Sequence, residues 1–164
     1  MRNIQLLTSA LVGILVSWSP ARAECDPDMS DRTLTARYQI NAGEVLDTNT
    51  NLTWARCSVG QSWNDATGCT GKVRTMNFDE AQKSARGVWR VPTKNELKTL
   101  ISTTCRNPSI NKEVFPKMNP DTMFYWSSTA DDASVGWFVD FDTGNIYGHR
   151  RSDALAVRLV RSAQ

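Results

Sequence analysis

The sequence predicts an α+β fold of mostly antiparallel strands, with two helices and two disulfides. Strand-like segments with alternating apolar residues come first, two helix-like segments follow, and further strands close the chain. That order is typical of α+β proteins, because parallel α/β folds alternate strand and helix along the chain. The chain has four cysteines and an N-terminal segment typical of exported proteins, and an even number of cysteines in an exported protein favours disulfides, here two.

Residues 1–23 have the features of a cleavable signal peptide. Arg2 supplies the positive start, residues 6–16 form an apolar run, and Ala21-Arg22-Ala23 is a small-x-small cleavage site. The apolar run is too short for a membrane span. Cleavage after Ala23 leaves 141 residues (164 less 23), a single domain over residues 24–164 that is long enough to bury a core. A periplasmic or secreted protein is therefore expected.

The predicted mature chain carries no net formal charge. Cleavage removes Arg2 and Arg22, so 17 of the 19 Lys and Arg residues remain, equal to the 17 Asp and Glu residues. Nucleic-acid-binding domains carry a marked basic surface, so no nucleic-acid partner is expected. Bulk charge gives no support for an anionic membrane surface either.

The cysteines Cys25, Cys57, Cys69 and Cys105 all lie in the mature chain, where three pairings are open. Cys57 and Cys69 flank a loop rich in Gly, Ser, Asn and Asp, which favours pairing 57 with 69 and 25 with 105. The short loop closed by Cys57–Cys69 would contribute roughly 3 kcal/mol in the chain-entropy treatment. Trp63, inside this loop, is expected to lie over the core as a lid; the alternative is an exposed contact residue.

Three short strands are expected before this loop, over residues 33–40, 44–46 and 52–56. The segment Asp47–Asn51 joins the last two. Its alternating Asp and Asn residues have the spacing of a calcium loop but lack the glycine and distal glutamate of that motif. A turn held by Asx side-chain hydrogen bonds is expected instead.

Two helices are predicted from their N-terminal caps. Asn77 precedes a helical face over residues 78–85, and Gly87 is expected to end that helix. The strand Trp89–Val91 then leads to Thr93 and Glu96, whose spacing is that of a capping box. The second helix is expected to run to about residue 103, with Leu97, Leu100 and Ile101 on its apolar face.

The remaining strands are expected over residues 124–128, 136–141, 146–147 and 156–161, with a hairpin turn at 142–145. In the last strand, Val157 and Leu159 alternate with the arginines. This pattern predicts one buried face and one charged face.

The best candidate for a ligand contact is Tyr147-Gly148-His149-Arg150-Arg151, expected in a long connection before the last strand. Arginine binds sulfate, carboxylate or phosphate through two parallel hydrogen bonds. Trp137 and Tyr125 would add a stacking surface for a sugar. The alternative is that Arg150 and Arg151 belong to a solvated loop, and that the two aromatic residues belong to the core.

No catalytic or metal-binding constellation is evident in the sequence. His149 is the only histidine, so neither a Ser-His-Asp nor a Cys-His arrangement has support from spacing. The cysteine spacing matches no usual zinc pattern. No metal, no cofactor and no enzymatic activity are therefore expected.

Many motifs together resemble one bacterial domain family, that of the C-terminal domain of the Legionella collagen-like adhesin. The resemblance covers nearly the whole mature chain and is carried, in order, by Glu44-Val45-Leu46-Asp47, Leu52-Thr53-Trp54-Ala55-Arg56-Cys57, Gly60-Gln61-Ser62-Trp63, Cys69-Thr70-Gly71, Phe78-Asp79-Glu80-Ala81, Trp89-Arg90-Val91-Pro92-Thr93 with Glu96-Leu97, Ile110-Asn111, Val114-Phe115-Pro116, Tyr125-Trp126-Ser127-Ser128, Trp137-Phe138-Val139-Asp140-Phe141 and Val157-Arg158-Leu159-Val160-Arg161.

The resemblance implies a C-type-lectin-like fold, export, and a binding role. In the adhesin that role is the binding of sulfated glycosaminoglycans by a trimer, so a sulfated polysaccharide and an oligomer are expectations here. This chain departs from the adhesin in having no Gly-X-Y collagen stalk.

Two other readings remain open. The motif Trp89–Thr93 with Glu96-Leu97 is also similar to the formylglycine-generating enzymes, but these need a late cysteine pair, and no cysteine follows Cys105. The second is a structural subunit of an envelope assembly, with an envelope protein as its partner.

Overall fold

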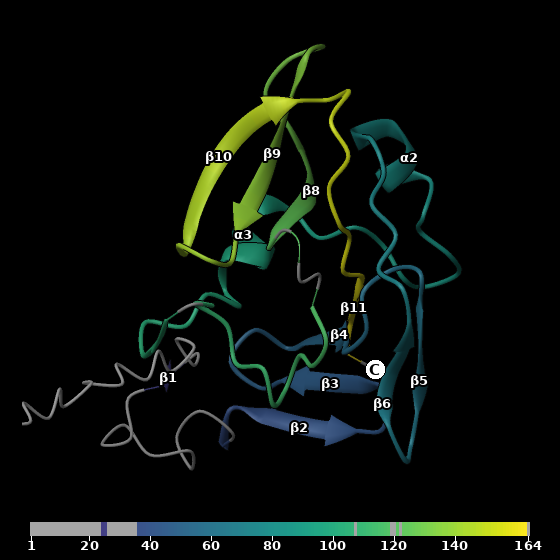
Figure 1. Cartoon of the computed structure of the whole chain (residues 1–164), viewed down its shortest axis with the longest axis vertical. Helices are drawn as coiled ribbons and strands as arrows, with labels where there is room; N and C mark the ends of the chain where they lie inside the picture. Colours follow the sequence, from purple (N-terminus) through teal and green to yellow (C-terminus); the bar gives the residue numbers. More distant parts are fainter. Residues whose placement is uncertain (1–23, 26–35, 107, 119–120, 122, 164) are drawn as a thin grey trace, which may run out of the picture.

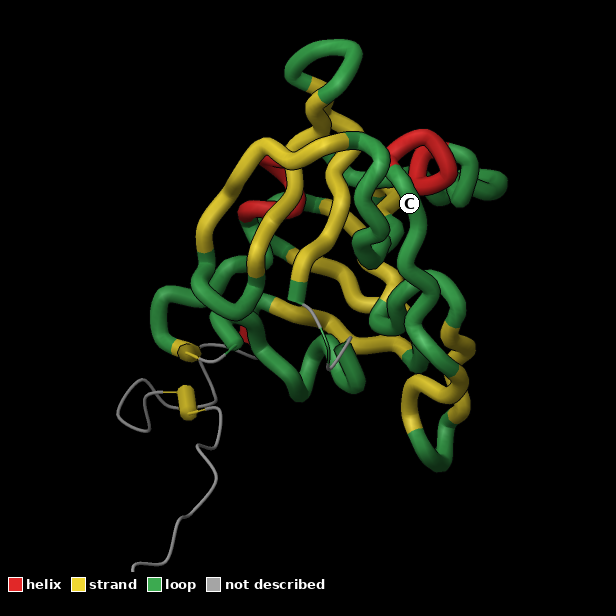
Figure 2. The backbone as a smooth tube through the Cα atoms, turned by 45° about the horizontal axis from the view of Figure 1, so that its top comes forward, coloured by secondary structure: helices red, strands yellow, loops and turns green. Residues whose placement is uncertain are grey.

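The computed structural model describes residues 24–25, 36–106, 108–118, 121 and 123–163. The predicted signal peptide lies outside them, as do residues 33–35 of the strand expected over residues 33–40, which begins at Tyr38 as β2. Strands and loops make up most of the described chain, and both helices are short (Figure 2). The elements are β1 (Glu24–Cys25), β2 (Tyr38–Asn41), β3 (Glu44–Asp47), β4 (Leu52–Ala55), β5 (Gln61–Asn64), β6 (Gly68–Gly71), α2 (Phe78–Gln82), α3 (Lys94–Lys98), β7 (Cys105–Arg106), β8 (Phe124–Ala130), β9 (Val135–Asp140), β10 (Asn145–Arg150) and β11 (Val160–Ser162).

The strands pair almost entirely antiparallel, as predicted. A four-stranded sheet has the order β11-β4-β3-β2 and a three-stranded sheet the order β10-β9-β8, while β5 pairs with β6 and β1 with β7. Figure 1 shows the three-stranded sheet at one end of the molecule and the four-stranded sheet at the other. The α+β class is therefore confirmed, while the C-type-lectin-like architecture stays a prediction.

The four-stranded sheet buries one face. Val45, Trp54 and Val160 lie opposite one another on neighbouring strands and are fully buried. They pack with Leu97 of α3 and with Phe115 from the loop before β8. Because successive side chains on a strand point to opposite faces, Leu46, Thr53 and Arg161 occupy the other face.

The three-stranded sheet lies between two clusters of buried side chains. Tyr125 and Val139 contribute to the cluster that also contains the buried face of the four-stranded sheet. Trp126 and Phe138 contribute to the second cluster, together with Phe78 of α2. The Phe78 ring meets the Trp126 ring edge-on, with centroids 5.4 Å apart.

Both predicted helix caps are present as complete capping boxes. The Thr93 hydroxyl accepts from the Glu96 backbone N–H at 3.2 Å, and the Glu96 carboxylate accepts from the Thr93 N–H at 2.8 Å. Asn77 and Glu80 do the same for α2. Arg90, just before α3, also donates two hydrogen bonds to Glu96, at 2.8 and 2.6 Å.

Both helices end earlier than the sequence predicts. In α3 the Thr99 hydroxyl donates to the Glu96 carbonyl, and the next backbone bonds, Leu100 to Leu97 and Ile101 to Lys98, span only three residues. A hydroxyl that bonds the preceding turn competes with continued helix, and the tighter three-residue bonds close the last turn. The helix therefore stops well before residue 103.

Gly87 does not terminate α2, which is a correction to the sequence prediction. The helix ends at Gln82, and Gly87 lies instead in a tight turn closed by two backbone hydrogen bonds between Arg86 and Trp89, each 3.0 Å. Its φ of +59° suits that turn, because glycine adopts positive φ without steric cost.

Asp47 forms the predicted Asx turn. Its carboxylate accepts from the Asn49 backbone N–H at 3.1 Å and from the Thr50 hydroxyl at 2.7 Å. Arg37 donates to the same carboxylate with two nitrogens, one of them at 2.6 Å. The Asp47 side chain is fully buried, and these bonds hold its pKa below the usual value even though burial alone would raise it.

Of the two predicted disulfides, Cys57–Cys69 is confirmed, with the two Cα atoms 5.4 Å apart. Cys25 and Cys105 lie directly opposite each other on β1 and β7. The side chain of Cys25 lies outside the described residues, so the second disulfide stays a prediction. No helix among the described residues is long and apolar enough to cross a membrane.

Candidate functional site

The segment predicted to be a binding loop is a strand. Residues 145–150 form β10, which pairs with β9 without a bulge and is an edge strand of its sheet (Figure 1). The sequence prediction ended this strand at residue 147 and placed His149 and Arg150 in a connection. The regular pairing continues as far as Arg150 opposite Val135. The pairing therefore fixes the face of the sheet on which each predicted ligand-binding residue of β10 lies.

Tyr147 and His149 lie on the same face of the sheet. Tyr147 is opposite Phe138, and His149 is opposite Gly136. The buried Phe138 ring contacts both, with centroids 5.8 Å from Tyr147 and 5.5 Å from His149. Tyr147 is nevertheless 47% exposed, so this face continues the aromatic core outwards to the surface.

Trp137 does not join them. It lies opposite Gly148, which places it on the other face of the sheet by strand alternation. There the ammonium group of Lys94, at the start of α3, sits 3.8 Å from the ring centroid. Tyr125 is fully buried, so neither aromatic residue adds to a stacking surface around Tyr147.

Arg151 is engaged in contacts within the fold. Its guanidinium pairs with Asp79 of α2 and lies over the Phe78 ring, 4.7 Å from the centroid. A second nitrogen reaches the Asp132 and Ala133 carbonyls at 3.5 and 3.4 Å. Arg151 therefore joins α2 to the turn between β8 and β9, and its charge is balanced locally.

His149 and Arg150 meet at one carboxylate. Asp153 Oδ2 is 3.3 Å from His149 Nε2 and 3.6 Å from Arg150 Nε. Arg150 remains 80% exposed at its side chain. We call Tyr147, His149, Arg150 and Asp153 the β10 patch. It combines an exposed aromatic ring with an accessible guanidinium, and Asp153 offsets one positive charge.

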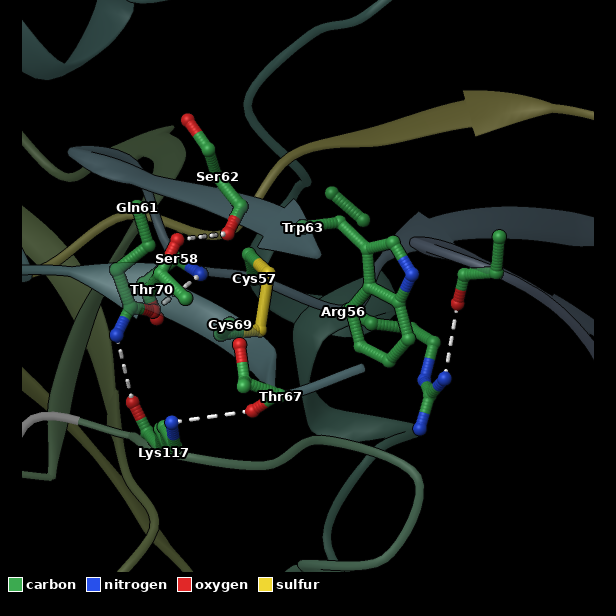
Figure 3. Close-up of a disulfide and its surroundings, with 12 residues drawn as sticks. Arg56, Cys57, Ser58, Gln61, Ser62, Trp63, Thr67, Cys69, Thr70 and Lys117 are labelled. Atoms are coloured by element: carbon green, nitrogen blue, oxygen red, sulfur yellow. Dashed lines mark hydrogen bonds between the residues drawn. A yellow bond between two sulfur atoms is a disulfide. The ribbon is translucent and has the colours of Figure 1, made fainter. Parts of the chain in front are cut away.

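Trp63 belongs to a different part of the molecule. It lies on β5 in the disulfide-linked hairpin, far from β10 (Figure 1). The Arg56 guanidinium stacks on the Trp63 ring, 4.3 Å from its centroid (Figure 3). A Cβ added at Gly43 would come within 2.7 Å of the Trp63 Cβ. Lys117 bonds the Thr67 carbonyl at 3.1 Å, so the hairpin is also tied to the loop before β8. Trp63 is a packing residue of this hairpin.

Two buried arginines are the main feature that the sequence did not predict. Arg158 was expected on a charged face, yet it is fully buried, which is a correction. One of its nitrogens donates to the Ala55 carbonyl at 2.7 Å and also to the Arg56 carbonyl. Arg56 in turn donates to the carbonyls of Val114, Ala42 and Glu113 at 2.8–3.0 Å. Burial lowers the pKa of both guanidinium groups.

A small polar cluster surrounds Arg158 in the core. The Ser58 hydroxyl is 2.8 Å from the Tyr125 hydroxyl and 3.4 Å from an Arg158 nitrogen. The Arg158 guanidinium also lies 4.8 Å from the Phe115 ring centroid. Ser58, Tyr125 and Arg158 are at most 1% exposed, so this cluster stabilises the fold without contacting solvent. Over the described ranges, no three His, Cys, Asp or Glu side chains gather in a group that would hold a metal ion.

Comparison with known proteins gives one result for the family. Residues 43–161 match the profile of the Lcl C-terminal domain. The matched range contains β3 to β10, both helices and most of β11. No curated protein matches the chain.

Proposed function

We propose that this chain, which belongs to the family of Lcl C-terminal domains, is an exported, non-catalytic binding module with a glycan as its ligand. The observation that carries the proposal is the β10 patch, where Tyr147, 47% exposed, shares a face of the sheet with His149, and Asp153 contacts both His149 and the exposed Arg150. The proposal includes the C-type-lectin-like architecture implied by the family resemblance.

Export is supported by the cysteines and by the N-terminal sequence. Cys57 and Cys69 are joined in a disulfide, and such bonds persist in oxidising compartments such as the periplasm or the extracellular space. The charged, apolar and small-x-small features of residues 1–23 agree with that route. Periplasmic and secreted forms are both consistent with these features.

A binding role is supported by what the polar side chains of the patch do. His149 is held between Asp153 and the Phe138 ring, so its imidazole serves packing and orientation. Tyr147 offers an amphipathic ring, which can pack on the apolar face of a sugar while its hydroxyl bonds water or ligand. Arg150 offers a planar donor fork that suits sulfate or carboxylate groups.

The charge balance of the patch limits how such a ligand is held. Asp153 partly neutralises Arg150, so binding of a sulfated polysaccharide depends on one accessible guanidinium together with ring contact. Such binding should be moderate and should weaken with salt, because exposed charges are screened over about 10 Å at 0.1 M ionic strength.

Heparin affinity chromatography tests the proposal. Wild-type protein should be retained at low salt, Arg150→Ala and Tyr147→Ala should elute earlier, and Asp153→Asn should elute later because it removes the opposing carboxylate. Arg86→Ala is the matched control for Arg150→Ala, since Arg86 is an exposed arginine in the turn after α2. Glu113→Gln, exposed in the loop before β8, is the charge control for Asp153→Asn.

The chromatography distinguishes a sulfated glycan from a protein partner as the ligand, and binding at the β10 patch from a general effect of net charge. If wild-type protein is not retained at low salt, a sulfated glycan is excluded as ligand, and capture of an envelope protein from the native host becomes the next experiment. If the control variants shift elution as much as the patch variants do, retention reflects net charge, and the β10 patch is not the site.

A further inference from the structure

The outer face of the four-stranded sheet carries a groove unrelated to the β10 patch. Its volume is about 360 Å³, and its lining includes Gln39, Asn41, Glu44, Leu46, Thr53 and Arg161. Binding sites for small molecules have volumes of roughly 300–1,000 Å³. The lining residues named above lie on β2, β3, β4 and β11, and Figure 1 shows these strands at the end of the molecule away from β10.

The strand register explains why these side chains share one face. Gln39 pairs with Leu46, Leu46 with Thr53, and Thr53 with Arg161, which makes one row across four strands. In the next row, Asn41 pairs with Glu44. Side chains that lie opposite each other on paired strands point to the same face. The row is therefore fixed by the sheet.

The same row continues beyond the sheet to an aromatic residue. Arg90 forms an antiparallel bridge with Val160, which places Trp89 beside Arg161. The Arg161 guanidinium is 5.3 Å from the Trp89 ring centroid. Trp89 is half-buried, so part of its surface borders the polar row.

The charges within the groove cancel. Glu44 and Arg161 are the two charged residues in its lining, and they form an ion pair at 2.7 Å. The Arg161 side chain is 17% exposed and the Glu44 side chain 43% exposed, so the carboxylate remains accessible as an acceptor. An ionic ligand would find no uncompensated charge here.

The remaining groups suit a ligand rich in hydroxyls. The amides of Gln39 and Asn41 each offer two donors and one acceptor, and both residues are exposed on β2. Leu46, on the neighbouring strand, supplies apolar surface beside them, and Trp89 adds an aromatic ring at the other end of the row, next to Arg161. A sugar ring presents hydroxyls at its rim and C–H groups on its faces, which is the complement of this arrangement. We propose that this groove binds an uncharged saccharide, at a site distinct from the β10 patch.

A printed array of uncharged oligosaccharides of glucose, mannose, galactose and N-acetylglucosamine tests this directly, followed by calorimetry on the best-retained sugar. The double variant Gln39→Ala/Asn41→Ala should weaken its binding about tenfold, because the amide hydrogen bonds to the sugar hydroxyls are lost. Asn95→Ala, an exposed amide on α3, is the matched control and should leave affinity unchanged.

Salt provides a second readout. Binding of an uncharged sugar should change little between about 0.05 and 0.5 M salt, because there is no ligand charge to screen. The proposal is overturned if no uncharged sugar is retained, or if the double variant binds as tightly as wild type while its melting curve is unchanged. Failure of heparin retention would overturn the preceding proposal and not this one, since the two probes differ in charge and in site.

Discussion

Replacing Thr93 with Ala is expected to lower the free energy of unfolding by about 1 kcal/mol, the usual cost of a lost N-cap. The hydroxyl accepts from the Glu96 N–H at 3.2 Å and lies 3.1 Å from the Glu96 carboxylate. Alanine leaves that first-turn N–H to water, since Thr93 is exposed. The cost therefore stays near the ordinary value for a cap.

Glu96→Ala should cost more, because Glu96 closes the capping box and also pairs with Arg90. The ion pair adds less than about 1 kcal/mol, since the two side chains are 42% and 23% exposed and solvent screens them. A total of roughly 1–2 kcal/mol follows for Glu96→Ala. The double variant Thr93→Ala/Glu96→Ala should cost less than the sum, because both changes break the same capping box.

The same glutamate gives stability a pH dependence. The Arg90 hydrogen bond, with those from Thr93, holds the pKa of Glu96 below its usual value of 4.5. A lowered folded-state pKa contributes stability that is present above the unfolded pKa and is lost as pH falls through the folded pKa. Below about pH 4.5, wild type should therefore lose stability more steeply than Glu96→Gln.

Urea unfolding followed by tryptophan fluorescence measures these differences, with the slope of free energy against urea expected to stay constant among variants. A Thr93→Ala cost below about 0.3 kcal/mol would refute the capping argument, since measured cap losses begin near 0.5. Heparin retention should be the same for Thr93→Ala and wild type. A selective loss of retention at unchanged stability would show that the junction before α3 contacts ligand.

Three further predictions concern packing and cross-linking. Gly136→Ala should lower the free energy of unfolding by about 1–3 kcal/mol in urea unfolding, because a Cβ there would lie 2.6 Å from Cε2 of Phe78. An unchanged free energy of unfolding would mean that α2 shifts freely to make room. Peptide mapping without reduction should recover Cys25 joined to Cys105, since their backbones are paired, and recovery of both as alkylated thiols would contradict it. Arg158→Lys should cost about 2 kcal/mol or more, because one ammonium cannot replace the planar fork and charged hydrogen bonds are worth about 1.5–3 kcal/mol each; wild-type stability in this variant would show that the fork is dispensable.

The parts of the fold that the sequence predicted are those fixed by near neighbours. The capping boxes join residues three apart, and the Asx turn joins Asp47 to Asn49 and Thr50. Side-chain type and spacing alone therefore reveal them. The disulfide between Cys57 and Cys69 is similarly local, with a separation of 12.

The sequence proposed residues for a ligand site, but it could not give their arrangement in space. Tyr147 and His149 share one face and Asp153 contacts both His149 and Arg150, yet strand alternation places Trp137 on the other face. Arg151 pairs with Asp79, which is 72 positions away. No local pattern marks such a partner, so the sequence could not distinguish the accessible arginine from the engaged one.

The burial of Arg158 shows how the chain satisfies its backbone where regular pairing stops. The regular ladder between β4 and β11 ends at Trp54 and Val160, with one further backbone bond from the Ala55 N–H to the Leu159 carbonyl. The carbonyls of Ala55 and Arg56 accept instead from the Arg158 guanidinium. A buried carbonyl without a donor costs about 1–3 kcal/mol, so the arginine replaces the missing sheet bonds.

The inward-facing Arg158 side chain explains why residues 156–161, which alternate in sequence like a strand, form a regular strand only from Val160 onwards. Residues 155–159 connect by single bridges to Met76 and Tyr125 before β11 begins, and a guanidinium turned inwards breaks the expected charged face. The buried arginines are thus committed to the backbone, and positive charge available to a ligand has to come from exposed side chains such as Arg150. Variants of Arg158 should accordingly change stability first, and any loss of glycan binding in them should follow the fraction unfolded.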